Sequence, residues 1–138
     1  MKTHTVEIRV RYVETDQGRA VYNAHFLTYF EVGRTEYLRR LGTAYRDLEA
    51  EGFYLVVTEA HCKYLSPARY DDLLEVTSWV ERVRPTRLDF RHRVHRKADG
   101  VPIAEGHLVL ACVDRGMRPC ALPAKVADAI EPCEDAAG

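Results

Sequence analysis

The sequence predicts an α+β fold in which a curved, five-stranded antiparallel sheet wraps around one long helix, and three observations lead to it. The chain has 138 residues, enough for a single domain over residues 1–138 with one hydrophobic core. One stretch alone has the length and apolar spacing of a long buried helix. The chain after it is typical of four strands joined by short turns, and strands without helices between them must pair in antiparallel fashion.

The first strand is expected at residues 5–13, where apolar and charged side chains alternate with a period of two. The apolar side consists of Val6, Ile8, Val10 and Tyr12, and the charged side of Glu7, Arg9 and Arg11. This pattern predicts a strand with one buried face.

The long helix is expected at residues 23–41, because apolar side chains recur there at spacings of three and four. The stripe consists of Phe26, Phe30, Gly33, Tyr37 and Leu41, widened by Leu27, Tyr29 and Leu38. Gly42 is placed to end this helix. A second, shorter helix is predicted from Thr43, as its N-cap, to Gly52, with Tyr45 and Leu48 facing inward.

Four further strands are expected at residues 53–65, 73–84, 86–97 and 102–114, and Asp99-Gly100 is a strong hairpin signal between the last two. The strand at 86–97 alternates, with Leu88, Phe90, His92 and Val94 on one face and Arg87, Asp89, Arg91, Arg93 and His95 on the other. Residues 118–138 are expected to form an irregular tail, with at most a short helix after Pro123. One sheet around one helix leaves an open edge and an exposed face, so we expect a homo-oligomer to cover them.

Composition indicates a globular protein: 46% of the residues are hydrophobic, 30% are charged, and the formal net charge is -1. Arginine is concentrated in residues 82–97, but no interleaved aromatics or nucleic-acid motif accompany it, so no nucleic-acid partner is expected. The four cysteines, Cys62, Cys112, Cys120 and Cys133, form no C-x-x-C pair and are expected to be small buried hydrophobes or incidental surface thiols. No segment has the apolar length of a signal peptide or membrane span, which favours a cytoplasmic protein.

Four separate blocks of the sequence resemble one known family. They are RYVETDQGRAVYNAHFLTYFEVGRTEYLRRLG (residues 11–42), YLSPARYDDLLEV (64–76), RPTRLDF (84–90) and VDRGMRPCALP (113–123). Together they resemble the hot-dog-fold acyl-CoA thioesterases of the 4-hydroxybenzoyl-CoA thioesterase family, over roughly residues 6–125.

The resemblance implies the hot-dog fold and an arrangement of subunits. Members of this family pair through the strand that is here 53–65, which makes a continuous sheet across a dimer, often within a homotetramer. Their active sites lie at the dimer interface. Each site would combine the Asp16 loop and the helix of one chain with the second strand of the other.

A thioesterase needs a base or nucleophile, and the resemblance assigns this role to Asp16. The residues alone leave another interpretation open, because Asp followed two positions later by Gly18 is common in structural turns. The backbone N–H groups at the start of the long helix, near Val21 to Ala24, are expected to bind the developing negative charge. Whether Asp16 acts as nucleophile or general base stays open.

The chain departs from the family pattern after Tyr22, where the usual His-Ala-Asn is replaced by Asn23-Ala24-His25. Asn23 cannot titrate near neutral pH but can hydrogen-bond a carbonyl or water, and we expect it to assist Asp16. His25 is expected on the helix face or an interface, as a candidate residue of the substrate pocket, rather than as a substitute base. Tyr12 and Tyr22 are expected either to line the acyl pocket or to be core aromatics.

Three helix residues, Glu31, Arg34 and Glu36, match the family's pattern, and an ion pair between Glu31 and Arg34 is the simplest expectation. Coenzyme A carries phosphates, which arginine binds well. By resemblance the nucleotide would lie near the turn Arg84-Pro85-Thr86-Arg87, so Arg84, Thr86 and Arg87 are candidate coenzyme A ligands, with Lys63 as a further one.

The sequence therefore predicts an acyl-CoA thioesterase with no metal and no cofactor apart from the coenzyme A of its substrate. Two alternatives stay open. A hot-dog hydratase or dehydratase would use a titratable histidine paired with an acid, and a non-catalytic acyl-CoA binding module would keep the pocket without turnover. The sequence does not define the acyl group.

Overall fold

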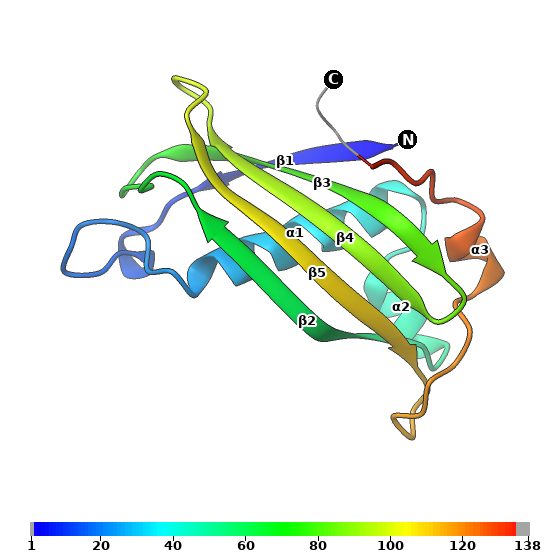
Figure 1. The fold of residues 1–138 in the computed structure, drawn as a ribbon. Coiled ribbons are helices and arrows are strands. Elements are labelled where there is room, and N and C mark those ends of the chain that lie inside the picture. The colour runs from blue at the N-terminus through cyan, green and yellow to red at the C-terminus, as the bar shows by residue number, and fades with distance from the viewer. Residues whose placement is uncertain (1, 135–138) are drawn as a thin grey trace.

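The computed structural model describes residues 2–134 and contains a five-stranded sheet in the order β1-β3-β4-β5-β2 (Figure 1). The strands are β1 (Thr3–Arg9), β2 (Tyr54–Tyr64), β3 (Leu73–Arg84), β4 (Arg87–Arg96) and β5 (Pro102–Val113). Every pairing between neighbouring strands is antiparallel. The predicted fold class is therefore confirmed.

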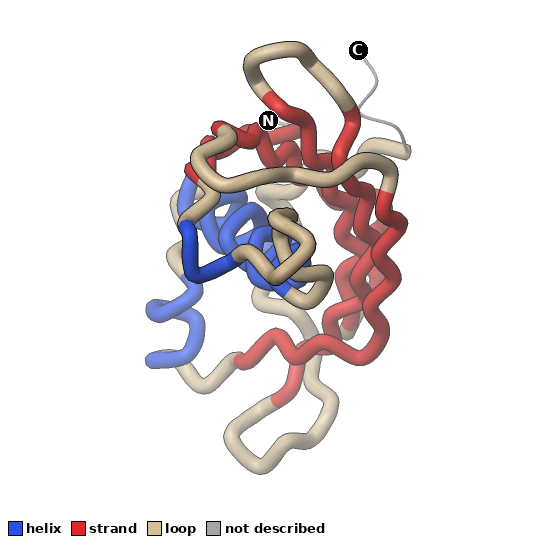
Figure 2. Tube along the Cα trace, turned by 90° about the vertical axis from the view of Figure 1, so that its left-hand side faces the viewer, coloured by secondary structure: helices blue, strands red, loops and turns tan. Residues whose placement is uncertain are grey.

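The long helix α1 (His25–Arg40) lies in the curve of the sheet, as the view along the molecule in Figure 2 shows. Two shorter helices, α2 (Tyr45–Ala50) and α3 (Ala124–Ala127), and a single 3₁₀ turn, η1 (Tyr12–Glu14), complete the described elements. Gly42 and Gly52 follow α1 and α2 with φ of 92° and 93°, a conformation that favours glycine. The predicted helix stops and the short helix after Pro123 are confirmed.

Some boundaries predicted from the sequence are wrong. The first strand ends at Arg9 rather than residue 13, because Arg9 is opposite Leu73, the first residue of β3, and the chain beyond it has no strand to pair with. Tyr12 lies instead on η1 and is 76% exposed, so it is not a core aromatic. Thr43 is not the N-cap of α2; Ala44 holds that position, and the Thr43 N–H donates to the Leu38 carbonyl at the end of α1.

The apolar face of α1 is narrower than predicted. Phe26, Tyr29, Phe30, Gly33, Tyr37 and Leu38 are buried. Leu27, expected to widen the stripe, is 41% exposed. This part of the helix therefore has apolar surface that the sheet of the same chain does not cover.

The tail is better packed than its sequence predicts. Leu122, Val126 and Ile130 are buried. Backbone hydrogen bonds join Leu122 to Pro85 and Cys133 to Val80, both at 2.9 Å. The expectation for residues 135–138 lies outside the described residues. Within residues 2–134, no helix combines the length and apolar character that crossing a bilayer requires.

An aromatic stack joins α1 to the centre of the sheet. The His92 imidazole lies parallel to the Phe30 and Phe90 rings, with centroids 5.0 and 5.8 Å away, and its Nδ1 is 2.7 Å from Ser78 Oγ. Burial, together with the positive charge of Arg34, lowers the pKa of His92 to about 3, so the imidazole is neutral in the folded protein near pH 7. The alternation predicted for residues 86–97 places His92 correctly on the core face.

Gly106 on β5 lets the Phe30 ring approach the sheet. A Cβ at this position would lie 2.5 Å from Phe30 Cε2, closer than carbon atoms tolerate. The absence of a side chain at Gly106 is therefore a packing requirement of α1.

We expect Gly106→Ala to lower the free energy of unfolding by about 1–3 kcal/mol, measured by urea denaturation, because the added methyl group displaces Phe30. The double variant Gly106→Ala/Phe30→Leu should lose less than the sum of its single variants, because the smaller side chain relieves the overlap. Strictly additive losses would contradict this account of the contact.

Candidate active site

Asp16 is the first residue of a tight loop between η1 and α1. The loop is closed by a bridge between Thr15 and Val21, and the Asp16 N–H donates to the Ala20 carbonyl at 2.9 Å. Asp16 Oδ1 accepts the Gly18 N–H at 2.8 Å, which is the turn expected of an Asp-x-Gly sequence. The side chain is exposed, and Oδ2 accepts no hydrogen bond from the residues that the structure describes. Oδ1 therefore stabilises the turn, whereas Oδ2 has no hydrogen-bond partner among the described residues.

Glu14 anchors this loop to the core. Its side chain is only 4% exposed, and Oε1 accepts the Arg11 N–H at 2.8 Å and the Tyr29 hydroxyl at 2.9 Å. Oε2 accepts the Arg11 guanidinium at 3.2 Å. The Glu14 carbonyl also accepts the Tyr22 N–H at 2.9 Å. Glu14 thus ties both ends of the Asp16 loop together and ties the loop to α1 through Tyr29.

The electrostatics of Glu14 agree with this geometry. Burial alone would raise the pKa of the Glu14 carboxyl, but the hydrogen bonds from Arg11 and Tyr29 outweigh burial and lower the pKa below its ordinary value. Burial and the neighbouring Glu14 charge raise the pKa of Tyr29, which keeps its hydroxyl protonated as a donor. The sequence gives no local sign of this role for Glu14, because its partner Tyr29 lies fifteen residues away.

The start of α1 has fewer free donors than predicted. The Val21 N–H donates to the Ala68 carbonyl at 2.8 Å and the Tyr22 N–H to Glu14, so neither is free to bind a ligand. The N–H groups of Asn23 and Ala24 have no acceptor among the described residues. These two groups are the N-terminal donors of a 16-residue helix, where partial positive charge accumulates.

The predicted site residues around this helix start lie close together. Tyr22 and Asn23 are exposed, and the Tyr22 ring meets His25 edge-on with centroids 6.3 Å apart. The Tyr64 hydroxyl, at the end of β2, donates to the Asn23 carbonyl at 3.1 Å. Tyr64 was not among the predicted site residues, although it opens one of the family-like blocks.

Three of the candidate coenzyme A ligands, Arg84, Thr86 and Arg87, lie far from Asp16 in the same chain. Figure 1 shows the Asp16 loop and the β3–β4 turn at opposite ends of the sheet, separated by the length of β3, which is roughly 40 Å for its twelve residues. Arg84 donates to Asp89 at 2.6 Å, whereas Arg87 is exposed.

Lys63 is not close to these arginines. It is opposite Glu105 on β5, whereas Arg87 is opposite Ala111, six residues and about 20 Å further along that strand. One chain therefore does not bring the four predicted ligands together with Asp16.

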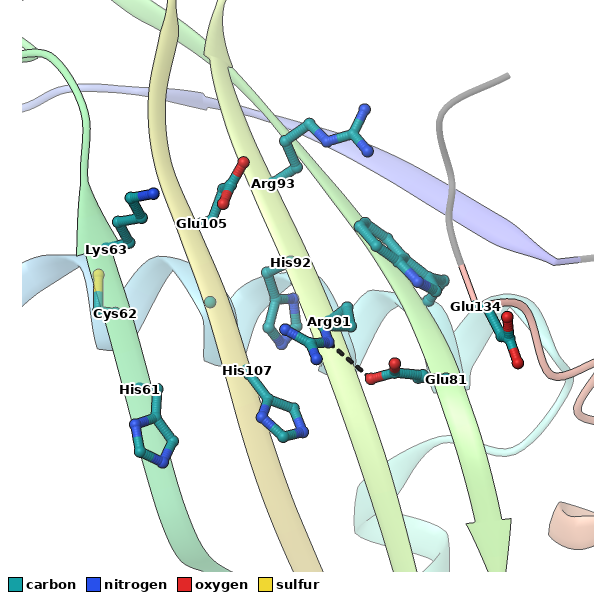
Figure 3. Close-up of a pocket in the computed structure, with 12 residues that line it drawn as sticks. His61, Cys62, Lys63, Glu81, Arg91, His92, Arg93, Glu105, His107 and Glu134 are labelled. Atoms are coloured by element: carbon teal, nitrogen blue, oxygen red, sulfur yellow. Dashed lines mark hydrogen bonds and ion pairs between the residues drawn. The ribbon is translucent and has the colours of Figure 1, made fainter.

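Several cavities lie elsewhere on the described part of the chain, and two of them are lined by a predicted site residue or by α1. One, of about 410 Å³, lies on the outer face of the sheet and is lined by Lys63, Trp79, Arg91 and His107 among others (Figure 3). The other, of about 250 Å³, lies between α1, α2 and the sheet. It is lined by Glu31, Arg34, Thr35, Leu38, Tyr45, Leu55, Phe90 and Leu110. Neither cavity includes Asp16.

Arg34 points a polar group into a mostly apolar environment. Its Nη1 is buried and has no hydrogen-bond partner in the described part of the chain. Burial lowers the pKa of Arg34, an effect that Glu31 opposes. Glu31 therefore acts on Arg34 through its charge, but among the described residues the two make no ion pair within 4.0 Å, whereas Arg39 and Glu36 of this helix pair at 3.3 Å.

Strand β2 is an edge of the sheet and exposes apolar side chains. Val57, Tyr64 and Leu65 are 45%, 52% and 40% exposed, and Leu27 and Tyr22 of α1 and its entry loop are similarly exposed. An exposed apolar edge strand is a surface on which another strand can pair.

Comparison with known proteins relates the sequence of this chain to one family. A model of the thioesterase-like superfamily matches residues 10–130. The acyl-CoA thioester hydrolase YbgC of Escherichia coli strain CFT073 is 36% identical over 120 residues, 86% of this chain and 89% of that protein. The acyl-CoA thioesterase YbgC of Haemophilus influenzae is 38% identical over 121 residues, 86% and 88% of the two chains.

The fold agrees with a solved thioesterase. The crystal structure of DHNA-CoA thioesterase from Staphylococcus aureus matches with a TM-score of 0.86 at 29% identity, covering 93% of this chain and 86% of that one. The hot-dog fold implied by the sequence resemblance is confirmed.

We expect Glu14→Gln to lower the free energy of unfolding by about 1–3 kcal/mol at pH 7, because its amide nitrogen would face the Arg11 guanidinium. A lowered folded pKa contributes stability above the ordinary glutamate pKa of about 4.3, and this contribution is lost as the pH falls through the lowered value. Urea denaturation should therefore show a smaller difference from wild type at low pH. An equal difference at pH 7 and at pH 3 would contradict an ionised Glu14.

Proposed function

Because this chain belongs to the thioesterase-like superfamily, we propose that it is an acyl-CoA thioesterase, which hydrolyses an acyl-CoA to a carboxylic acid and free coenzyme A. The observation that carries the proposal is the position of Asp16, which presents a free carboxylate oxygen on a loop anchored to the start of α1. No metal ion or resident cofactor enters the proposed reaction.

The proposed chemistry uses the negatively charged carboxylate of Asp16 and the partial positive charge of two backbone N–H groups. Asp16 either removes a proton from the attacking water or attacks the thioester carbonyl itself. The Asn23 and Ala24 N–H groups hold the carbonyl oxygen, where negative charge develops in the transition state. The Asn23 side chain orients the water or the carbonyl by hydrogen bonding.

We propose that two chains build each site by pairing through β2. An antiparallel pair centred on Glu59, the middle of β2, sets Tyr64 of one protomer beside the Tyr54 end of its partner. Arg87 lies near that end, because Val56 pairs with Ala111 and Ala111 pairs with Arg87. The partner's Arg87 would then lie about 15 Å from the helix start that carries the Asp16 loop, a span that coenzyme A bridges.

The same pairing assigns the acyl group to the 250 Å³ cavity. Leu55 lines that cavity and lies at the β2 end that would face the partner's Asp16 loop. The volume is below the range of roughly 300–1,000 Å³ typical of drug-sized ligands, which favours a short acyl chain or a small aromatic group. The buried Nη1 of Arg34 offers a donor to an oxygen atom on that group.

Coenzyme A is assigned to the arginines at the β3–β4 turn. Arg87 is exposed and suits a phosphate oxygen. Arg84 is already paired with Asp89, and Thr86 supplies a hydroxyl between them in sequence. Lys63 lies on a different part of the sheet and contributes only if the nucleotide extends across its outer face.

We also propose that the protein is cytoplasmic and forms a homo-oligomer. A cytoplasmic location is supported by Cys62, Cys112 and Cys120, whose thiols are not joined in disulfides and so fit a reducing compartment. A homodimer is supported by the exposed apolar edge of β2, and a homotetramer would cover the outer sheet face as well.

We expect Asp16→Asn to lower kcat for acyl-CoA hydrolysis by about 10²-fold or more while leaving the fold intact, because the Asn carbonyl oxygen can still accept the Gly18 N–H. The measurement is release of free thiol across a panel of acyl-CoA substrates.

Asp114→Asn is a matched control. Asp114 begins a second Asp-x-Gly turn, and its Oδ1 accepts the Gly116 N–H at the same 2.8 Å. This variant should keep kcat near wild type. Equal activities for the Asp16 and Asp114 variants would contradict the catalytic role, and no thiol release by wild type from any acyl-CoA would favour a binding module.

A further inference from the structure

Two of the four cysteines form a close pair that the proposed reaction does not use. Cys112 Sγ, near the end of β5, lies 3.5 Å from Cys120 Sγ, in the segment that follows it. The other two cysteines, Cys62 and Cys133, lie on β2 and in the described tail.

The backbone holds the two thiols in register. Val113 and Pro119 form an antiparallel bridge, the Cys120 N–H donates to the Cys112 carbonyl at 3.0 Å, and the Asp114 N–H donates to the Arg118 carbonyl at 2.9 Å. Cys112 and Cys120 are therefore directly opposite across this short ladder. Residues directly opposite in an antiparallel pair have Cα atoms about 4.5–5.5 Å apart, within the range of about 4.4–6.8 Å found for disulfides.

The two thiols differ in access to solvent. Cys112 is fully buried, whereas Cys120 is only partly buried, so an external reagent meets Cys120 first. Burial, with the neighbouring Cys120, raises the pKa of Cys112 to about 12. The Cys112 thiol is therefore protonated near pH 7 and loses its proton only when it attacks another sulfur. This division suits a pair in which one sulfur is attacked from outside and the other resolves the product.

We propose that Cys112 and Cys120 form a reversible redox pair, which closes to an intramolecular disulfide by exchange with a low-molecular-weight disulfide such as glutathione disulfide. The Cys120 thiolate attacks one sulfur of glutathione disulfide, forms a mixed disulfide and releases one glutathione thiolate. Cys112 then attacks Cys120 Sγ, gives its proton to the released thiolate and displaces the second glutathione. Two protein thiols are oxidised and one glutathione disulfide is reduced to two glutathione molecules.

The Cys112–Cys120 pair lies next to the β3–β4 turn, to which its own segments are hydrogen-bonded. The Cys112 N–H donates to the Thr86 carbonyl at 2.8 Å, and the Leu122 N–H donates to the Pro85 carbonyl at 2.9 Å. Hydrogen bonds from both sides of the thiol pair therefore hold the turn that carries Arg84 and Arg87. A bond between the sulfurs would fix the segment 119–122 against β5 and stiffen that turn.

The test is to equilibrate the purified protein with glutathione disulfide, then measure its mass and its titratable thiols after unfolding. We expect a loss of two hydrogen masses, a fall from four titratable thiols to two, and a peptide linking Cys112 to Cys120. The melting temperature should rise by about 5–10 °C, as expected for a short loop closed in a domain of this size, and return on reduction.

Matched variants separate this pair from the other cysteines. Cys120→Ser should abolish the mass change and the rise in melting temperature, and Cys62→Ser, at a similarly half-buried position, should leave both unchanged. Four thiols remaining after equilibration, a glutathione adduct on Cys120 that never resolves, or a disulfide that uses Cys62 or Cys133 would each overturn the proposal. None of these readouts depends on acyl-CoA hydrolysis, so they stand apart from the proposed function.

Discussion

The packing of α1 against one curved sheet determines where the other parts of the molecule lie. Phe30 fits against Gly106 and stacks on His92, and Tyr37 meets Phe90 edge-on with centroids 5.5 Å apart. These contacts set the height of the helix above the sheet, and so fix where its N-terminus and the Asp16 loop emerge. A single sheet cannot also cover the far side of α1 and its own edge at β2, which leaves apolar surface exposed.

The position of the candidate site depends on the buried carboxylate of Glu14, which is hydrogen-bonded to Tyr29 of that helix. Glu14 is held by Arg11 and Tyr29, so the loop that begins beside it has a fixed origin on the core. Asp16 is exposed, but backbone hydrogen bonds and one bond to its own carboxylate oxygen constrain the loop that it begins. Such a carboxylate would need little reorganisation to take the catalytic role proposed for it.

Periodicity and turn chemistry were enough to predict most of the fold. The alternation of buried and exposed side chains along β4 and the helix stops at Gly42 and Gly52 both follow from local sequence patterns. Tertiary packing did not change either of them. Glu14 could not be found in this way, because a carboxylate in a polar stretch is ordinarily exposed and its burial depends on Tyr29 far along the chain. The Cys112–Cys120 contact likewise depends on the turn between them, which brings together two cysteines eight residues apart.

If each active site combines Asp16 of one protomer with Arg87 of its partner, subunit complementation should restore activity to a mixture of two weakly active variants. Asp16→Asn chains and Arg87→Glu chains, each of low activity at substrate concentrations below KM, are unfolded, mixed and refolded together. In a symmetric dimer the mixed species has one site with both wild-type residues, so the mixture should recover about a quarter of wild-type activity. Activity no higher than the average of the two variants alone would show that both residues come from one chain and would contradict the account.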